Sequence, residues 1–517
     1  MSQPLTSQKP GMSRLFAVLT MLLLALLAGV YCAGLKLSAG PFVVTPVSET
    51  ERYPGGSATV SISPFASMEK VVPNLPEREK PHFYSGRALA RQPWVKAPTI
   101  TDARDGLGPI YNARGCLACH IKGGKSLLPT RPDAPLFGPL VRMSVVLDDA
   151  SAMQTAAQSV DGVIPDPVYG DQLQTQSIAL LHQLHKATPL EIAESGDVPP
   201  EAYAYLDWEA SSYTYPDGHV VELRKPLLNL KHAAYGDFDP NTRFSLRNAP
   251  AIHGMGLLER IPQQALAALA DPDDLNGDGI SGRQNQVWDS RTQSFQPGRF
   301  GHKANRPNLD MIVGSAFAND IGISNPMFPN QPCSPQQTLC NAQRNGNNRQ
   351  GFELPDNLLR LVTNFNRNLG VPIRRDMDNS DVKAGRSLFY QAGCHQCHQP
   401  SFVTEDRVAG IDEPQSHLGG QTIWPYTDLL LHDMGPALAD GRPDFAASGS
   451  EWRTPPLWGA GLLQQVNGAA AYLHDGRART LEEAILWHGG EAAAAQGRFV
   501  NLSQQQRQQL LKFVGSL

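Results

Sequence analysis

The sequence of 517 residues predicts a mainly α fold with two domains and long connecting loops, preceded by an N-terminal membrane anchor or signal. Three observations support this fold class. Two C-x-x-C-H pentapeptides, at 116–120 and 394–398, each follow a helix-like run that ends in Gly-Cys. The last residues, 502–517, combine a serine cap with apolar side chains at helical spacing. The 46 glycines and 42 prolines indicate long ordered loops between short elements.

Composition and charge exclude one class of function. Lysine and arginine number 44 against 49 aspartate and glutamate, so the net charge is −5. No run of basic residues is present, which argues against nucleic-acid binding. The apolar fraction of 41% is enough for a packed core.

The N-terminus contains an uncharged, mostly apolar run at residues 15–35, about long enough to cross a bilayer. Lys9 and Arg14 precede this run, and acidic residues follow only from Glu49, which places the N-terminus in the cytoplasm and the rest of the chain outside. We therefore predict that residues 1–36 form an uncleaved anchor. A cleaved signal peptide is the alternative, although the small-residue cleavage site after the run is poor.

Each C-x-x-C-H pentapeptide carries the residues that attach a c-type haem. The two thiols add to the vinyl groups of the haem, and the following histidine becomes the proximal ligand of the iron. Zinc half-sites or redox dithiols are the alternative, and the histidine in both motifs favours haem. The predicted attachment residues are Cys116, Cys119, Cys394 and Cys397, and the predicted proximal ligands are His120 and His398.

The remaining cysteines help to place the protein in the cell. Cys32 lies inside the apolar run, and Cys333 and Cys340 stand close enough in sequence to close a small loop. In an oxidising compartment we expect this pair to form a disulfide. Haem attachment, an export segment and paired cysteines together predict the periplasmic side of a bacterial inner membrane.

The sequence divides into four predicted segments. A β-hairpin at 213–223, with a Pro-Asp-Gly turn, is expected as an insertion among the helices. The segments are an anchor or signal at 1–36, a linker rich in Pro, Ser and Glu at 37–80, an N-terminal haem domain with insertions at 81–378, and a C-terminal cytochrome c domain at 379–517.

An acidic loop at 271–282 predicts a cation site in the N-terminal domain. Asp274, Asn276 and Asp278 alternate along it and precede a glycine, as oxygen ligands of calcium do in tight loops. Asn285 stands where an EF-hand has glutamate, so the loop is not a complete EF-hand. A solvated acidic turn is the alternative to a calcium site.

Residues 453–458 and 472–488 resemble the end of bacterial di-haem cytochrome c peroxidases and of their relatives that oxidise protein side chains. The chain is more similar to the di-haem oxidoreductase family, whose members are described as peroxidase-like and sometimes labelled thiol oxidoreductases. No additional catalytic cysteine supports thiol oxidation. Further matching stretches lie at 169–173, 256–259, 298–301, 425–435 and 451–454.

This resemblance implies an activity as well as a fold. Electrons enter at the second haem and pass to the first, where peroxide is reduced. The implied donor is a small redox protein or a quinol-linked protein, and an oligomer is compatible with the family. The alternative is a membrane-tethered di-haem electron carrier in which both haems are six-coordinate and no peroxide chemistry takes place.

The resemblance also implies a sixth ligand for the second haem. In the peroxidases a methionine stands fourteen residues after the histidine of the HDG motif, and in the side-chain-oxidising relatives a tyrosine stands there. Here that position is His488, which implies a bis-histidine haem of lowered reduction potential. Met434 is the alternative ligand, and a role of His488 at the end of a helix is the non-functional alternative.

The first haem is less defined by the sequence. The stretch 246–250 resembles the peroxidases, in which a carboxylate or amide beyond it works on bound peroxide. Glu259 stands in that position, and a buried salt-bridged glutamate is the alternative. His253 or Met255 could instead occupy the iron as a sixth ligand. Arg477, in the HDG motif, is expected to pair with a haem propionate.

His302 stands where the family more often has tryptophan, so the resemblance implies no role for His302.

Overall fold

The computed structural model describes residues 44–62, 67–100, 104–408 and 416–517. The described residues belong to one compact unit, 44–517. The predicted anchor at 1–36 and Cys32 lie outside them. Within the described part of the chain, no helix is both long enough and apolar enough to cross a membrane.

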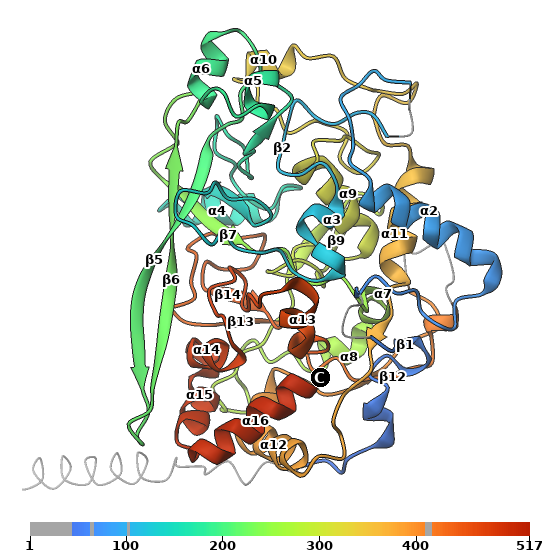
Figure 1. The fold of residues 1–517 in the computed structure, drawn as a ribbon, viewed down its shortest axis with the longest axis vertical. Coiled ribbons are helices and arrows are strands. Elements are labelled where there is room, and N and C mark those ends of the chain that lie inside the picture. The colour runs from blue at the N-terminus through green and yellow to red at the C-terminus, as the bar shows by residue number, and fades with distance from the viewer. Residues whose placement is uncertain (1–43, 63–66, 101–103, 409–415) are drawn as a thin grey trace, which may run out of the picture. The chain divides into compact units, whose positions relative to one another are not determined.

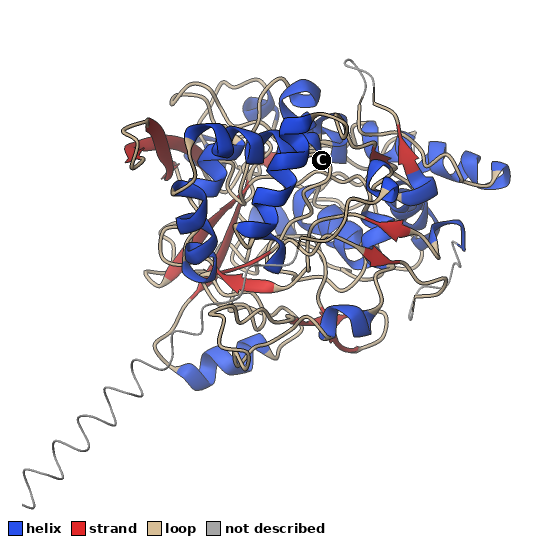
Figure 2. Cartoon of the chain, turned by 90° about the horizontal axis from the view of Figure 1, so that it is seen from below, coloured by secondary structure: helices blue, strands red, loops and turns tan. Residues whose placement is uncertain are grey.

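The fold is mixed rather than mainly α, with 31% helix and 17% strand. Seven two-stranded sheets account for the strands of the described residues. Most of these pairs join segments that are distant in sequence, so the local pattern did not reveal them. Figure 2 shows the short helices and strands with long loops between them.

The helices are mostly short. Their bounds are α2 Lys80–Arg91, α3 Cys116–Cys119, α4 Ala150–Ala157, α5 Leu180–Gln183, α6 Pro189–Glu194, α7 Met255–Glu259, α8 Gln263–Ala267, α9 Leu309–Asp320, α10 Thr338–Asn341, α11 Asp356–Arg367, α12 Ser380–Gln391, α13 Leu463–Asn467, α14 Leu481–Leu486, α15 Ala493–Val500 and α16 Gln504–Ser516.

The strands pair as β1–β10, β2–β4, β3–β7, β5–β6, β8–β9, β11–β12 and β13–β14. All pairs are antiparallel except β1–β10. Their bounds are β1 Thr59–Val60, β2 Ile110–Tyr111, β3 Leu140–Val145, β4 Gln176–Ser177, β5 Tyr203–Thr214, β6 Val220–Lys231, β7 Thr242–Arg247, β8 Gln286–Asp289, β9 Ser294–Pro297, β10 Val371–Pro372, β11 Phe402–Val403, β12 Thr422–Ile423, β13 Leu431–Asp433 and β14 Glu451–Arg453.

The largest hydrophobic core draws on both sides of the predicted domain boundary near residue 378. It is built on α2, α9 and α11, and Phe402, Ile423 and Trp458 pack into it from the C-terminal side. The two halves therefore share buried apolar surface.

The described part of the predicted linker, 44–62 and 67–80, is folded into this unit. Glu51 is fully buried and forms ion pairs with Arg374 and Arg386. The strand β1 pairs with β10 far along the chain. A composition rich in Pro, Ser and Glu suggested a tether, but these long-range partners order the segment.

The segment 379–517, predicted as a cytochrome c domain, has the first and last helices expected for it. The helix α12 leads directly into the second C-x-x-C-H motif, and the capping box of Ser503 begins α16. The two helices pack closely: Phe389 and Phe513 lie 5.2 Å apart, and a Cβ at Gly385 would collide with the backbone of Gln509. The predicted terminal helix is therefore confirmed.

The predicted hairpin is confirmed and is longer than expected, with twelve-residue strands β5 and β6. Figure 1 shows it running along one side of the molecule past α14. At its turn, Asp217 pairs with Arg507 at 2.7 Å and Tyr215 donates to Glu482 at 2.9 Å. The hairpin thus connects the N-terminal half to the helices of the C-terminal domain. The predicted Cys333–Cys340 disulfide is also confirmed.

Candidate functional site

The first C-x-x-C-H motif forms the single turn α3, and His120 follows it. Its Nδ1–H donates to the carbonyl oxygen of Pro250 at 2.7 Å. This hydrogen bond fixes the tautomer and leaves Nε2 to bind a metal, as in most metal-ligating histidines. Burial lowers the pKa of His120, which favours the neutral imidazole that ligates iron.

The second motif repeats this arrangement. The Nδ1–H of His398 donates to the carbonyl oxygen of Tyr426 at 3.0 Å. Burial lowers the pKa of His398 to about 4, and the charge of a protonated His488 lowers it as well.

The cysteines of both motifs are unpaired in the structure. Burial raises the pKa of Cys116, Cys119 and Cys394 to about 12, so these thiols are protonated at neutral pH. Redox dithiols instead need a depressed thiol pKa. The dithiol interpretation is therefore disfavoured.

Zinc is disfavoured by the ligands within reach. Among the described residues, one group has metal-ligand spacing: Cys397, Asp428 and His432. Both ring nitrogens of His432 are already hydrogen-bonded to carboxylates. A structural zinc site needs four free ligands, which this group does not offer.

His488 lies just beyond the end of α14 and is half-buried. Its Nδ1–H donates to the carbonyl oxygen of Ala484 at 2.7 Å, so its Nε2 can also face a metal. The alternative ligand Met434 is nearby, because a Cβ at Gly489 would lie 3.1 Å from the Met434 oxygen. The chain segments that carry the two predicted candidates for the sixth ligand therefore lie against each other.

The two proximal histidines are connected by a continuous route of backbone and hydrogen bonds. From Pro250 the chain runs back to Asn248, whose carbonyl oxygen accepts from His302 Nε2 at 2.9 Å. The carbonyl oxygen of His302 accepts from Arg453 N at 2.9 Å. The next residue, Thr454, accepts from Thr427 Oγ1 at 2.6 Å, and Thr427 is adjacent to Tyr426, the partner of His398.

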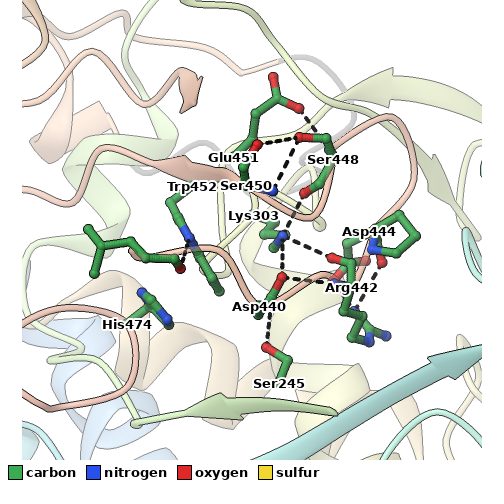
Figure 3. A network of polar contacts seen from close by, with 12 residues as sticks. Ser245, Lys303, Asp440, Arg442, Asp444, Ser448, Ser450, Glu451, Trp452 and His474 are labelled. Atoms are coloured by element: carbon green, nitrogen blue, oxygen red, sulfur yellow. Dashed lines mark hydrogen bonds and ion pairs between the residues drawn. The ribbon is translucent and has the colours of Figure 1, made fainter. Parts of the chain in front are cut away.

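A buried charged network surrounds Lys303, the residue that follows His302 (Figure 3). Lys303 is fully buried and donates to Asp440 at 3.0 Å and to two backbone carbonyls. Burial lowers the pKa of Lys303 to about 8. Its ammonium lies 4.5 Å above the ring of Trp452, and His474 stacks on that ring with centroids 3.6 Å apart. These contacts immobilise the region between the two motifs.

A family model described as "Di-haem oxidoreductase, putative peroxidase" matches residues 51–517. This match covers almost all of the described chain. The chain belongs to the di-haem oxidoreductase family. The resemblance inferred from the sequence is thereby confirmed, and the protein is an oxidoreductase that uses haem.

The other comparisons add little. No curated protein matches this di-haem oxidoreductase. A solved structure of hydrazine synthase from Kuenenia stuttgartiensis aligns with 82% of this chain and 100% of its own at 15% identity. Its TM-score of 0.28 is too low to support an argument.

The predicted catalytic carboxylate of this di-haem oxidoreductase, Glu259, already has partners within the protein. Glu259 is 2% exposed, accepts from Leu309 N at 2.7 Å and pairs with Arg367 at 2.7 Å. Both of its oxygens therefore have partners, which favours the buried salt-bridged alternative.

The sequence analysis missed a second carboxylate near the first motif. Asp320, the last residue of α9, raises the thiol pKa of both Cys116 and Cys119 through its charge. Burial raises its own pKa to about 6, against a hydrogen bond from Gln172 at 2.9 Å. An acidic residue at the C-terminus of a helix opposes the helix dipole, and that signal could have identified it.

The predicted propionate partner Arg477 has a protein partner. It pairs with Asp475 at 2.7 Å and donates to a backbone carbonyl. By contrast, no carboxylate among the described residues lies within ion-pair distance of Lys125 or Arg453. Burial lowers the pKa of Lys125 to about 8 and that of Arg453 to about 10. A haem carboxylate would satisfy either cation.

The acidic loop is exposed and lies beside the second motif. Its carboxylates cap backbone N–H groups: Asp274 accepts from Gly279 at 3.2 Å and Asp278 accepts from Ile280 at 2.9 Å. Asp278 also accepts from Gln396, inside the second motif, at 3.0 Å. Asn276 accepts from the Asp278 N–H. Calcium at Asp274, Asn276 and Asp278 stays a prediction.

Proposed function

We propose that the protein is a periplasmic c-type di-haem oxidoreductase that reduces peroxide at the haem of the first motif with electrons from the haem of the second. Each bound haem supplies an iron that exchanges one electron, and reduction of one hydrogen peroxide to two waters takes two electrons and two protons. The observation that carries the proposal is the route through His302 between the two proximal histidines.

Covalent attachment is the first part of the proposal. In each motif the two thiols precede a histidine whose Nδ1 is tied to a backbone carbonyl. The four thiols are held protonated by burial and have no disulfide partner. They are therefore available for addition to haem vinyl groups during maturation.

The second site has two histidines that would hold the iron of a bound haem. His398 and His488 each donate Nδ1–H to a carbonyl, so both rings are fixed with Nε2 available. Two strong ligands suit electron transfer, because they leave no position for peroxide.

The first site has one fixed histidine and a nearby acid. Asp320, with a pKa of about 6, is poised to take a proton from one peroxide oxygen and return it to the other. Glu259 acts instead as a buried partner of Arg367. Lys125 is available for a propionate of the first haem.

The cellular setting follows from the sequence and one structural feature. The Cys333–Cys340 disulfide supports an oxidising compartment. We propose that a small redox protein or a quinol-linked protein donates the electrons, on the periplasmic side of the inner membrane.

The carrier alternative is favoured by one observation. His253 is 3% exposed, and its Nδ1 has no hydrogen-bond partner in the described residues. Its Nε2 donates to the carbonyl of Trp458 at 3.0 Å. A histidine ligand at the first haem would close it to peroxide and leave a six-coordinate carrier.

Intramolecular electron transfer tests the proposal. In the matured protein, His302→Ala should slow transfer from the second haem to the first after rapid reduction, with both haems retained. His185→Ala, at an exposed histidine, is the matched control. An unchanged transfer rate in His302→Ala would exclude the route, and no peroxide turnover by the wild type would exclude the enzyme.

A further inference from the structure

A buried charged triad lies beside the second motif. His432, in β13, donates from Nε2 to Asp428 at 2.8 Å and from Nδ1 to Glu491 at 2.7 Å. The three side chains are 3%, 3% and 10% exposed. Burial alone would lower the pKa of His432, but the two carboxylates raise it well above its usual value. The triad thus joins His432 to two buried acidic side chains through both of its ring nitrogens.

One end of the triad is bound to the second motif. The backbone N–H of Asp428 donates to the carbonyl oxygen of Cys397 at 3.0 Å. The Nδ1 of His432 also lies 3.8 Å from the Cys397 sulfur. The motif that ends in His398 is therefore in direct contact with Asp428 and His432.

The other end of the triad is bound to the segment that carries His488. Glu491 accepts from Ser281 N at 3.0 Å, from Ser281 Oγ at 2.9 Å and from Asp433 N at 3.0 Å, besides its bond to His432. Four hydrogen bonds thus fix this carboxylate against two other segments of the chain.

Only two glycines separate His488 from Glu491, and both are confined. Gly490 has a φ of +54°, and a Cβ there would collide with the carbonyl of Asp433. A Cβ at Gly435 would lie 2.8 Å from the nitrogen of Gly490. The backbone between His488 and Glu491 is therefore packed tightly against its neighbours. A displacement of Glu491 would move His488 as well.

We infer that Asp428, His432 and Glu491 are positioning residues that hold His488 opposite His398. The inference rests on the proposed bis-histidine ligation of the second haem. Neither His432 nor Glu491 contacts the iron in this arrangement; they act through the His488 segment and through Cys397.

The test uses the matured full-length protein and reads out the second haem directly. Glu491→Gln keeps the shape of the side chain but removes its charge and one acceptor for His432. We expect loss of part of the low-spin bis-histidine signal in the electron paramagnetic resonance spectrum and an upward shift of the second haem's reduction potential. Glu482→Gln, which changes a carboxylate at the hairpin contact, is the matched control.

His488→Ala separates this inference from the proposed ligation. If His488→Ala removes the low-spin signal while Glu491→Gln leaves signal and potential as in the wild type, the positioning role is overturned and the ligation stands. If His488→Ala leaves the second haem unchanged, the ligation itself is refuted. The spectrum of the first haem in each sample reports whether the variant has folded.

Discussion

The regions around the two C-x-x-C-H motifs share the hydrogen bond of the motif histidine and differ in their surroundings. His120 and His398 each donate Nδ1–H to a backbone carbonyl. Near the second motif, His488 is held in the same way, with a charged triad behind it. Near the first motif, the sequence-predicted carboxylate Glu259 is occupied by Arg367, and a different carboxylate, Asp320, is close.

This difference matches the two tasks proposed for the protein, which are electron transfer and peroxide reduction. A region with two fixed imidazoles is built to keep its iron coordination constant as electrons pass. A region with one fixed imidazole and an acid of raised pKa suits chemistry that moves protons. The difference between the two regions can be tested by experiment.

The largest expected effect is on stability. Glu259→Ala leaves the buried guanidinium of Arg367 with only its longer contact to Asp310. We expect a loss of about 3 kcal/mol in the free energy of unfolding, as for a broken buried ion pair. Urea unfolding of the matured protein measures it, and Asp133→Asn, at an exposed pair with Arg131, should cost about 0.5 kcal/mol. If the variant is as stable as the wild type but its peroxide turnover falls about 100-fold, Glu259 is the catalytic residue.

The next effect concerns catalysis at the first haem. Asp320→Asn removes the proposed proton acceptor, and peroxide turnover should fall by about 100-fold, at the low end of the range for general acid–base catalysis. Steady-state peroxide assays with a reduced donor measure it, and the optical spectrum of the second haem should not change. Turnover close to that of the wild type would exclude Asp320.

The pH dependence of turnover gives a second test of the role of Asp320. Burial raises the pKa of Asp320 to about 6, and the carboxylate form accepts the proton. Turnover should therefore rise as pH increases through about 6, and the residual activity of Asp320→Asn should lack this limb. A rise that persists in the variant would assign the ionisation to another group.

The smallest effect is expected at the acidic loop, which touches the second motif through Asp278 and Gln396. If calcium binds there, chelation should lower the thermal midpoint, and added calcium should restore it, as mass action requires. Asp274→Asn should abolish the response. A midpoint that is insensitive to calcium in the wild type would leave the loop as a solvated turn.

Much of the site could be predicted from the sequence because its signals are local. The two C-x-x-C-H motifs, α12, the capped helix α16, the hairpin and the Cys333–Cys340 pair all depend on residues close together in the chain. Local spacing also led to the prediction of His488 as a ligand, through the resemblance to known peroxidases, and this assignment stays a prediction.

The remainder depends on contacts between distant segments. The pairing of β1 with β10 and the burial of Glu51 between Arg374 and Arg386 have no local signature, so residues 44–62 and 67–80 resembled a linker. His302 was left without a role because its partner Asn248 lies far away in the sequence. Arg367 is also far from Glu259 in the sequence, so the ion pair between them could not be predicted.

Carbon monoxide binding to the fully reduced, matured protein tests the central difference between the two regions most directly. The account predicts one carbon monoxide per two haems, bound at the first haem, because His488 closes the second. No binding would mean that both irons are closed and that the protein is a carrier. Two molecules bound would mean that His488 does not hold the second iron.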